Sequence, residues 1–349
     1  MNIPMKKRII SAAVLVGVFL AAFAGLYWYK THGKGKEAIR DIYAMDTEME
    51  IKTYGKDADK AADAAVSEIQ RLDKMLSAQN EDSEIYKLNQ AGELDVSDEA
   101  VSMIQEAKEL SEETDGAFDI TVYPLMEAWG FPSQDYRVPE QSEIDELLTH
   151  VGSDKTTIDG NHVTLAKGTQ IDLGGIAKGY TSARLMEIFQ KYDLTTAMVS
   201  LGGNVQTLRP KEDGTDWNIA IRDPKDPSDS SGYVGVVSVS SDAVITSGGY
   251  ERYFVQDGKT YQHILDPSTG YPADSGIISS TIVSKNGTLA DGLSTALYVM
   301  GADKAEQFWR EHSDEFDFVL VTSDGKILVS EGLESRFTSD GDVEIIRKS

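Results

Sequence analysis

The stretch Asp172-Leu173-Gly174-Gly175-Ile176-Ala177-Lys178-Gly179-Tyr180 decides the fold that we expect around it. The apolar run 169–173 predicts a short strand, and apolar residues at helical spacing after the glycines predict a helix over 176–192. A glycine turn between a strand and a helix places backbone N–H groups where they can face an anion. Asp172 starts the turn, and Lys178 follows the first glycine by four residues. Together these residues suit a phosphate-bearing ligand.

The alternative is a tight turn in which the glycines only permit a positive φ angle. The glycines do not follow the GxGxxG order of dinucleotide-binding domains, and no Lys-Ser or Lys-Thr pair follows them as in a P-loop. The stretch therefore argues against an ordinary Rossmann or P-loop domain.

The composition is that of an acidic protein with a substantial core. Hydrophobic residues make up 40% of the 349 residues, and the formal net charge is -25. An acidic surface repels nucleic acid, so we expect no nucleic-acid partner. A phosphate ligand would need a divalent cation to offset the same repulsion. Cysteine is absent, which excludes disulfides, thiolate metal sites and a catalytic thiol.

The N-terminal residues predict a single-pass membrane anchor. A basic cytoplasmic tail over residues 1–8 precedes an uncharged apolar run over residues 9–29, close to the ~20 residues that a helix needs to cross a bilayer. Residues 30–40 then form a tether, and residues 41–349 form one extracytoplasmic domain. The alternative is a cleaved signal peptide, because Ala22-Phe23-Ala24 fits a small-residue cleavage pattern.

The rest of the chain mixes helices with mostly antiparallel strands. It shows no regular alternation of strand and helix, so we predict an α+β fold in one large domain with flanking helices. The expected helices cover residues 58–76, 83–88, 97–114, 141–148, 176–192, 288–300 and 302–312. The expected strands cover residues 49–54, 156–158, 162–165, 170–173, 197–200, 204–208, 217–221, 233–240, 243–246, 252–256, 279–283, 318–322 and 326–329.

A second informative segment runs from Thr288 to Leu297. Asp291 and Thr295 are four residues apart and hence neighbours on one face of the expected helix. A carboxylate and a hydroxyl offer two hard oxygen ligands to Mg²⁺, which completes its shell with waters or phosphate oxygens. We therefore expect Asp291, Thr295 and the bend at Gly174 to share one cavity. The alternative is an aspartate near the start of a helix and an unremarkable threonine.

A third segment, Tyr261 to Pro272, contains the best acid–base candidate. His263 ends an expected strand and precedes an Asp-Pro-Ser-Thr-Gly turn. The chain has 5 histidines, and the other four lie in the tether, near element ends or in polar stretches. A histidine beside a turn rich in hydroxyls suits proton transfer. The alternative is an exposed histidine beside a structural turn.

Three further segments are weaker signals. The glycine pairs in 200–204 and 246–250 each follow an expected strand, and each is either a turn that lines a cleft or only a tight turn. Residues 115–122 carry two aspartates, a phenylalanine and a threonine. That segment either holds a planar ring and a ribose or is a loop that leads into the next element.

These segments, in this order, resemble the FAD:protein FMN transferase family, often called ApbE. The resemblance covers about residues 41 to 345. It is carried by Met45-Asp46-Thr47, by Gly116 to Thr121 with Trp129-Gly130-Phe131, by the stretch 172–180, and by the segments 200–204, 245–250, 263–270 and 290–297.

The resemblance implies a defined reaction and a set of site residues. It implies that the chain binds FAD with Mg²⁺, transfers FMN to a Thr or Ser side chain of an exported or membrane protein, and releases AMP. By position in the family motifs, the FAD contacts would be Met45, Ala117, Phe118, Asp119, Asp172 and Lys178. The Mg²⁺ ligands would be Asp291, Thr295 and the carbonyl of Gly175, and His263 would be the base for the acceptor hydroxyl.

Two other functions stay open at this stage. A hydrolase would split FAD into FMN and AMP with water in place of the acceptor hydroxyl. A passive exported protein would only bind the flavin, although simple binding does not require the paired oxygen ligands at Asp291 and Thr295.

Overall fold

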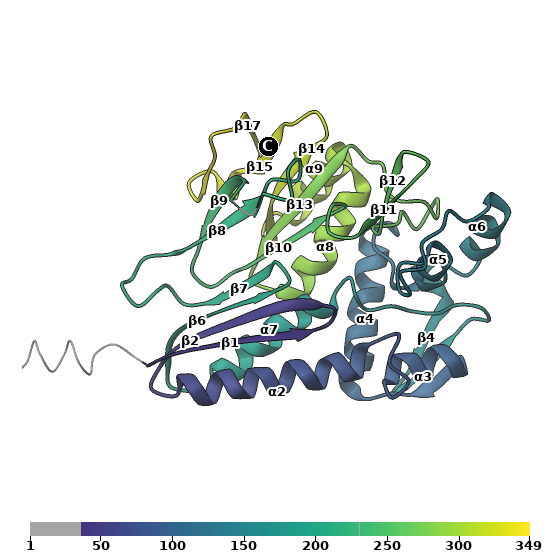
Figure 1. Ribbon diagram of the computed structural model, residues 1–349, viewed down its shortest axis with the longest axis horizontal. Coiled ribbons are helices and arrows are strands. Elements are labelled where there is room, and N and C mark those ends of the chain that lie inside the picture. The colour runs from purple at the N-terminus through teal and green to yellow at the C-terminus, as the bar shows by residue number, and fades with distance from the viewer. Residues whose placement is uncertain (1–35, 230) are drawn as a thin grey trace, which may run out of the picture.

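A large mixed sheet crosses the structure, a computed structural model that describes residues 36–349 apart from residue 230 (Figure 1). Neighbouring strands in this 9-stranded sheet are antiparallel, except for the last pair, which is parallel. In spatial order the strands are β1 (Lys36–Ala44), β2 (Thr47–Gly55), β6 (Leu194–Leu201), β7 (Asn204–Leu208), β10 (Ala243–Gly248), β13 (Ile277–Ser284), β14 (Phe316–Thr322), β15 (Ile327–Ser330) and β17 (Val343–Ile346).

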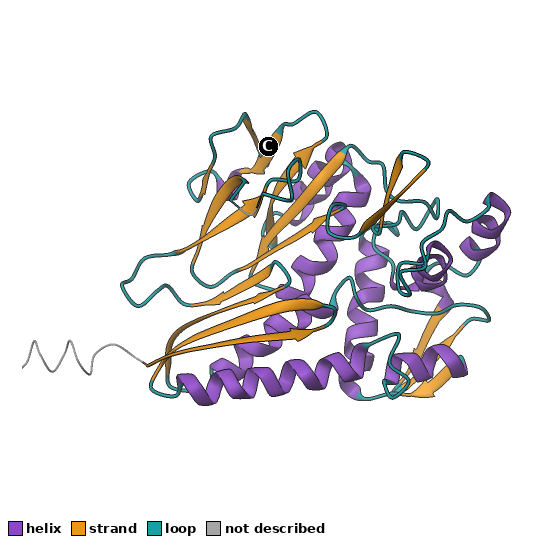
Figure 2. Ribbon diagram, viewed as in Figure 1, coloured by secondary structure: helices purple, strands orange, loops and turns teal. Residues whose placement is uncertain are grey.

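Four helices cover one face of this sheet (Figure 2). They are α2 (Ala58–Leu76), α7 (Ala177–Phe189), α8 (Gly287–Met300) and α9 (Ala302–His312). In α2, Ala62, Ala65, Ile69 and Leu72 are fully buried and follow one another at helical spacing. This apolar stripe packs on β1 and β2, while α7 packs on β6 and β7 and α8 on β10 and β13.

A small three-stranded sheet covers the opposite face. Its strands are β8 (Trp217–Arg222), β9 (Tyr233–Val239) and β16 (Phe337–Thr338). Inward-facing residues of β8 and β9 share one apolar cluster with residues of β10, β13, β14 and β15. The large sheet is therefore buried on both faces over its central strands, which explains why they are rich in Val and Ile.

The remaining elements gather at one end of the large sheet (Figure 1). They comprise a three-stranded sheet, a two-stranded hairpin, four helices and two short 3₁₀ turns. Their bounds are β3 (Glu93–Asp95), β4 (Thr156–Asp159), β5 (His162–Leu165), β11 (Tyr253–Gln256), β12 (Lys259–Gln262), α3 (Glu84–Ala91), α4 (Asp98–Glu113), α5 (Tyr123–Trp129), α6 (Gln141–Leu148), η1 (Ile120–Val122) and η2 (Ser153–Lys155). A third 3₁₀ turn, η3 (Glu331–Leu333), follows β15 and packs against β14 instead.

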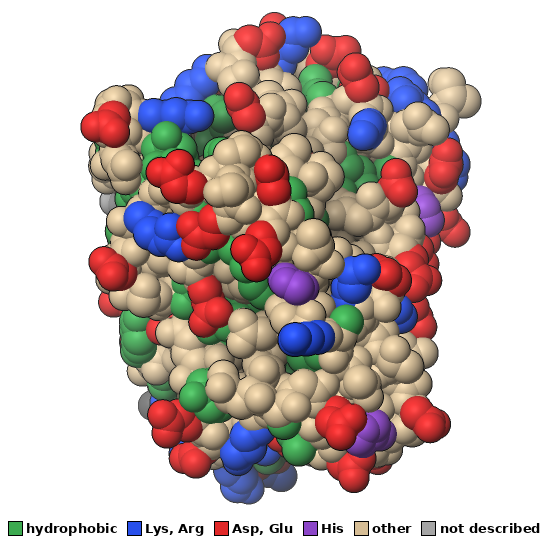
Figure 3. Space-filling view, turned by 90° about the vertical axis from the view of Figure 1, so that its right-hand side faces the viewer, with side chains coloured by type: hydrophobic (Ala, Val, Ile, Leu, Met, Phe, Trp, Pro, Cys, Tyr) green, Lys and Arg blue, Asp and Glu red, His purple; other side chains and the backbone are tan. Residues whose placement is uncertain are grey.

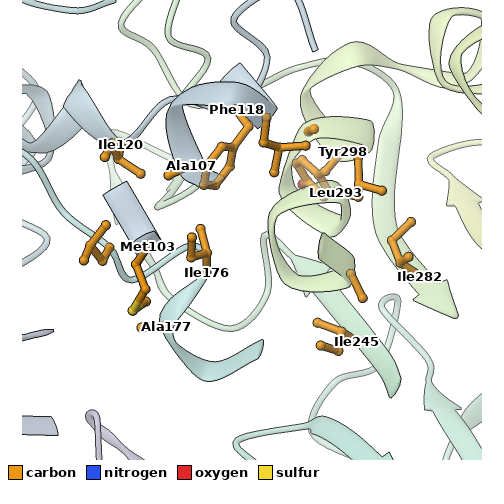
Figure 4. Close-up of a cluster of buried hydrophobic side chains, with 14 of the residues drawn as sticks. Met103, Ala107, Phe118, Ile120, Ile176, Ala177, Ile245, Ile282, Leu293 and Tyr298 are labelled. Atoms are coloured by element: carbon orange, nitrogen blue, oxygen red, sulfur yellow. The ribbon is translucent and has the colours of Figure 1, made fainter. Parts of the chain in front are cut away.

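The main apolar core lies between these elements and the helices. Figure 4 shows Phe118, Ile176 and Leu293, which come from three distant parts of the sequence, in one cluster with Ile245 and Ile282. Phe118 is 3% exposed, and Leu293 and Ile176 are each 1% exposed. The segment that carries Phe118 is thus held against the starts of α7 and α8 by apolar packing.

The negative charge of the chain does not form one continuous patch on the face shown in Figure 3. Acidic side chains are spread over that face, with Lys and Arg side chains between them. On that face the acidic composition therefore does not mark a particular binding site.

The predicted α+β fold with mostly antiparallel strands is confirmed. Helices α2, α6 and α9 begin and end at the predicted residues. Ser97 caps α4 by accepting a hydrogen bond from the Ala100 N–H. The predicted tether over 30–40 is wrong at its C-terminal end, because residues 36–40 already belong to β1.

The expected strand over 169–173 is also wrong. The backbone there pairs with no strand, and its hydrogen bonds go elsewhere. The Asn89 side chain accepts from the Ile171 N–H at 2.8 Å and donates to the Ile171 carbonyl at 2.8 Å, and the Asp172 N–H donates to the Ile120 carbonyl at 2.8 Å. An amide side chain can satisfy a buried backbone as a neighbouring strand would, because it carries both a donor and an acceptor.

The predicted membrane anchor over residues 9–29 lies outside the described residues. Within residues 36–349, residue 230 aside, the structure contains no helix that is both long and apolar enough to cross a bilayer.

Candidate active site

A cavity of about 330 Å³ lies where the turns of the large sheet meet the starts of α7 and α8. Its walls come from the β1–β2 turn, the segment before η1, the glycine bend before α7, the end of β10, and the residues that flank the β11–β12 hairpin. All residues predicted for the site line it: Met45, Ala117, Phe118, Asp119, Asp172, Gly175, Lys178, His263, Asp291 and Thr295.

The predicted meeting of Asp291 and Thr295 with the bend at Gly174 in one cavity is confirmed. The individual roles of these residues remain predictions. Sequence reasoning gave no individual role to Asn204, Ser247 or Arg252, which also line the wall, because their contacts with the predicted site residues arise only from the fold. The glycine pairs beside Asn204 and Ser247 were the available signal, and both turns do line the cleft.

Two glycines let α7 and α8 approach closely at this cavity. A Cβ atom at Gly179 would lie 2.2 Å from the Gly287 carbonyl oxygen and 2.5 Å from the Cβ of Asp291. With no side chain there, the Gly179 N–H donates to Oδ2 of Asp291 at 2.7 Å. The Asp291 carboxylate thus sits at the N-terminus of α7, where the helix dipole favours negative charge.

This arrangement corrects one expectation. The backbone N–H groups of the stretch 172–180 were expected to face an anionic ligand such as a phosphate, but two of them bind carboxylates of the chain itself. The Gly174 N–H donates to Oδ1 of Asp172 at 3.0 Å, and the Gly179 N–H donates to Asp291. The physical logic of an anion at a helix N-terminus holds, but the anion there is a protein side chain.

Replacing Gly179 by Ala should destabilise the protein by about 1–3 kcal/mol, as overpacking does. Ala normally stabilises a helix interior relative to Gly by about 1 kcal/mol, so the expected sign is opposite to the helix propensity. Urea unfolding measures the difference. Gly232→Ala is the control, because its added Cβ would meet nothing closer than 3.4 Å. A stable Gly179→Ala variant would contradict the close approach of the two helices.

Asp291 is buried and fully oriented before any ligand binds. The side chain is 4% exposed, and Oδ1 accepts from the Asn204 amide at 2.9 Å. Burial raises the pKa of Asp291, while the positive charge of Lys178 and the hydrogen bonds from Gly179 and Asn204 oppose that rise. Each carboxylate oxygen still has a free lone pair, because an ionised carboxylate offers about four acceptor sites.

Asn204 owes its position to a two-residue turn between β6 and β7. Gly202 and Gly203 have φ angles of 61° and 92°, the left-handed values that such a hairpin turn requires at both positions. The first residue after the turn is therefore fixed at the mouth of the hairpin. Its amide reaches Asp291, which lies 87 residues away in the sequence.

The oxygen groups near Asp291 fit a divalent cation of the Mg²⁺ type. One carboxylate, the Thr295 hydroxyl and the Gly175 backbone line the same cavity, and all supply hard oxygen donors. No cluster of three or more His, Cys, Asp and Glu side chains that could hold a metal ion occurs in the part of the chain that the structure describes. A cation there would need phosphate oxygens or waters to complete its shell.

Arg252 holds His263 through its backbone. The Arg252 carbonyl accepts from the His263 N–H at 3.0 Å and lies 3.1 Å from Nδ1 of the imidazole. Since a carbonyl oxygen can only accept, the neutral ring must carry its proton on Nδ1. The other ring nitrogen, Nε2, is then an unprotonated acceptor. Phe131 packs edge-on against the ring, with centroids 6.4 Å apart.

The imidazole is kept neutral by its surroundings. Removal from bulk water, followed by the positive charges of Arg252 and Lys178, lowers the pKa of His263 to about 3. At neutral pH the ring is therefore unprotonated at Nε2.

Replacing Arg252 by Gln should raise the pKa of His263 toward the ordinary value of about 6.5. The positive guanidinium disfavours protonation of the ring, so its removal favours the charged form at higher pH, while the backbone contact to Nδ1 stays. An NMR titration of the imidazole signals measures the shift. His162, whose pKa is raised by its hydrogen bond to Asp95, is the internal control and should not change. An unchanged His263 titration would contradict the electrostatic coupling.

The wall around Met45 is a strained turn. Met45 and Asp46 connect β1 to β2 with φ angles of 48° and 58°, which are unfavourable for side chains other than Gly. Asp73 on α2 accepts from the Met45 N–H at 3.0 Å and so stabilises the turn. Strain at a cavity wall is typical of positions that contact ligands.

The segment with Phe118 and Asp119 is held by polar contacts as well as by the core. Oδ1 of Asp119 accepts from the Thr121 N–H at 2.8 Å and from its hydroxyl at 2.6 Å. A Cβ atom at Gly175 would lie 2.9 Å from the Phe118 ring, so the glycine bend and the aromatic ring are in direct contact.

Known proteins that resemble this chain in sequence or in fold belong to one family. The ApbE family model matches residues 45–320. The FAD:protein FMN transferase of Klebsiella pneumoniae (strain 342) is 30% identical over 300 residues, which cover 84% of this chain and 92% of the relative. That of Treponema pallidum (strain Nichols) is 30% identical over 344 residues, which cover 92% of this chain and 94% of the relative.

Solved structures give the same result. The ApbE protein of Thermotoga maritima superposes with a TM-score of 0.81 at 36% identity and covers 86% of this chain and 99% of its own. The flavinyl transferase ApbE of Pseudomonas stutzeri superposes with a TM-score of 0.75 at 25% identity and covers 87% of this chain and 99% of its own. With the family model spanning most of the described residues, the chain belongs to the ApbE family.

Proposed function

We propose that this protein is a Mg²⁺-dependent FAD:protein FMN transferase. It moves FMN from FAD to a Thr or Ser side chain of an acceptor protein and releases AMP. One observation carries the proposal: a single cavity holds an unprotonated histidine nitrogen beside a cluster of hard oxygen donors. A size of about 330 Å³ is within the range of small-molecule sites, which are roughly 300–1,000 Å³.

His263 accepts the proton of the acceptor hydroxyl in this proposal. As the hydroxyl oxygen bonds to the FMN phosphorus, its proton passes to Nε2 of the imidazole. The bond from that phosphorus to the bridging oxygen breaks, and AMP leaves with the bridging oxygen. The Arg252 carbonyl then stabilises the resulting imidazolium, because it already accepts from Nδ1.

Asp291, Thr295 and the Gly175 carbonyl are the residues that would hold Mg²⁺. Bound there, the ion would offset the charge of the pyrophosphate oxygens. Lys178 and Arg252 line the same cavity and add positive charge on this acidic protein. Phosphoryl transfer depends mostly on positioning and charge neutralisation, which these groups provide.

Met45, Ala117, Phe118, Asp119, Asp172 and Lys178 are the proposed FAD contacts. Their place on the cavity wall supports this assignment. The sulfur and aromatic ring of Met45 and Phe118 suit the flat face of a flavin, and the carboxylates suit its hydroxyl and N–H groups.

We further propose that the protein acts outside the cytoplasm, at the cell membrane. The apolar run over residues 9–29 with its basic N-terminal flank supports a single-pass anchor. The acceptors would then be exported or membrane proteins.

Incubation with FAD, Mg²⁺ and candidate exported acceptors tests the function. We expect the acceptor to gain the mass of one FMN unit, and AMP to appear in equal amount. Release of FMN and AMP with no labelled acceptor would favour a hydrolase, and binding of FAD without turnover would favour a passive flavin carrier.

A further inference from the structure

A chain of three hydroxyl groups links Thr295 to the backbone of α8. Ser294 donates to the Asp291 carbonyl with an oxygen–oxygen distance of 2.7 Å. The Ser247 hydroxyl lies 2.7 Å from that of Ser294 and 3.2 Å from that of Thr295. Ser247 is near the end of β10, so the chain joins the central sheet to the helix that carries both proposed oxygen ligands.

The direction of these hydrogen bonds follows from counting protons. Each hydroxyl has one proton, and a carbonyl oxygen can only accept. Ser294 uses its proton on the Asp291 carbonyl, so the short contact to Ser247 needs the proton of Ser247. Ser247 can then only accept from Thr295, and the Thr295 proton points at Ser247.

This direction decides what Thr295 presents to the cavity. Its oxygen offers lone pairs alone, which is the state that a cation ligand requires. A helical threonine commonly donates instead to the carbonyl three or four residues before it. Here the carbonyl four residues before Thr295 is that of Asp291, and Ser294 already donates to it.

We propose that Ser247 is a positioning residue for the divalent cation, since it accepts the Thr295 proton and turns the threonine lone pairs into the cavity. The inference rests on the proposed function insofar as it assumes a cation at Asp291 and Thr295. Partners that orient metal ligands typically contribute 10–100-fold to metal affinity. A purely structural link between β10 and α8 would stabilise the fold without altering cation binding.

The test measures cation affinity directly with Mn²⁺, which takes the same oxygen ligands as Mg²⁺. The loss of the free-ion EPR signal gives the dissociation constant of the intact protein. We expect Ser247→Ala to weaken Mn²⁺ binding about 10-fold or more. FAD affinity measured without metal by flavin fluorescence should stay unchanged. Ser247→Thr keeps a hydroxyl and should bind Mn²⁺ as the parent does.

Thr281→Val is the matched control. Thr281 is 0% exposed and its hydroxyl pairs with that of Thr246 at 2.8 Å, on the strand next to Ser247, but it does not line the cavity. The control removes one hydroxyl of a neighbouring hydroxyl pair that does not contact Thr295, so the Mn²⁺ affinity of this variant should equal that of the parent.

A double-mutant cycle tests whether Ser247 affects cation binding through Thr295. If Ser247 acts through Thr295, then Ser247→Ala should weaken Mn²⁺ binding no further in a Thr295→Val background. Parental Mn²⁺ affinity in Ser247→Ala, or full additivity with Thr295→Val, would overturn the proposal for Ser247 alone. A parent protein that labels acceptors yet binds no Mn²⁺ would overturn the cation site itself and leave the transferase function standing.

Discussion

Asp291→Ala should reduce FMN transfer by about 10²-fold or more, because loss of a group that stabilises transition-state charge typically costs that much. The substitution removes the only carboxylate that the site residues would give to the cation. It also frees the Gly179 N–H and the Asn204 amide, which then face the cavity without an acceptor. The residual activity should no longer respond to Mg²⁺ concentration, and initial rates over a Mg²⁺ titration measure this.

Asp242→Asn is the matched control for Asp291. Both aspartates are 4% exposed, but Asp242 lies away from the cavity and pairs with Lys285 and Arg336 at 2.6 Å each. Its loss should lower the urea midpoint while the Mg²⁺ dependence stays as in the parent. Asp291→Ala with an unaltered Mg²⁺ response would remove Asp291 from the site.

His263→Asn should lower transfer by about 10²-fold or more, the usual contribution of a general base. The Asn amide can still donate to the Arg252 carbonyl in place of Nδ1, but nothing replaces the Nε2 lone pair. The variant should therefore bind FAD normally and fold normally. Single-turnover labelling of an acceptor, with FAD affinity measured separately, distinguishes the two effects.

His162→Asn is the control for His263. His162 lies on β5 with a side chain that is 45% exposed, pairs with Asp95 at 2.8 Å, and does not line the cavity. Full transfer activity in His263→Asn would reject the base assignment, whereas loss of FAD binding would point to a structural role.

Much of the fold could be predicted because its helices carry their own local signal. The helical spacing of apolar residues in α2 and α9 is visible in the sequence itself and predicts which face of each helix is buried. Strand β1 could not be predicted in this way. Its alternating charged residues resemble a polar linker, and its stability comes from pairing with β2 and from packing under α2. That context is absent from the local sequence.

In the site, too, local features could be predicted and contacts between distant segments could not. The four-residue spacing predicted that Asp291 and Thr295 are neighbours on one face of a helix. The sequence also predicted that they share a cavity with the glycine bend at Gly174. The partners that orient them could not be predicted, because they come from elements that are distant in the sequence. Asn204, Gly179 and Ser247 reach Asp291 or Thr295 across 87, 112 and 48 residues of sequence. Only the packing of α8 against α7 and β10 brings them together.

Because Asp291 already contacts the start of α7, we expect folding and cation binding to be separate events. Many small metalloproteins combine the two. Where a cation cross-links ligands that are otherwise loose, chelation unfolds the protein. Here one helix supplies the carboxylate and another already neutralises part of its charge through an amide 112 residues away. We therefore expect that depletion of the proposed cation leaves this corner of the molecule folded, and that the ion binds and leaves together with each dinucleotide.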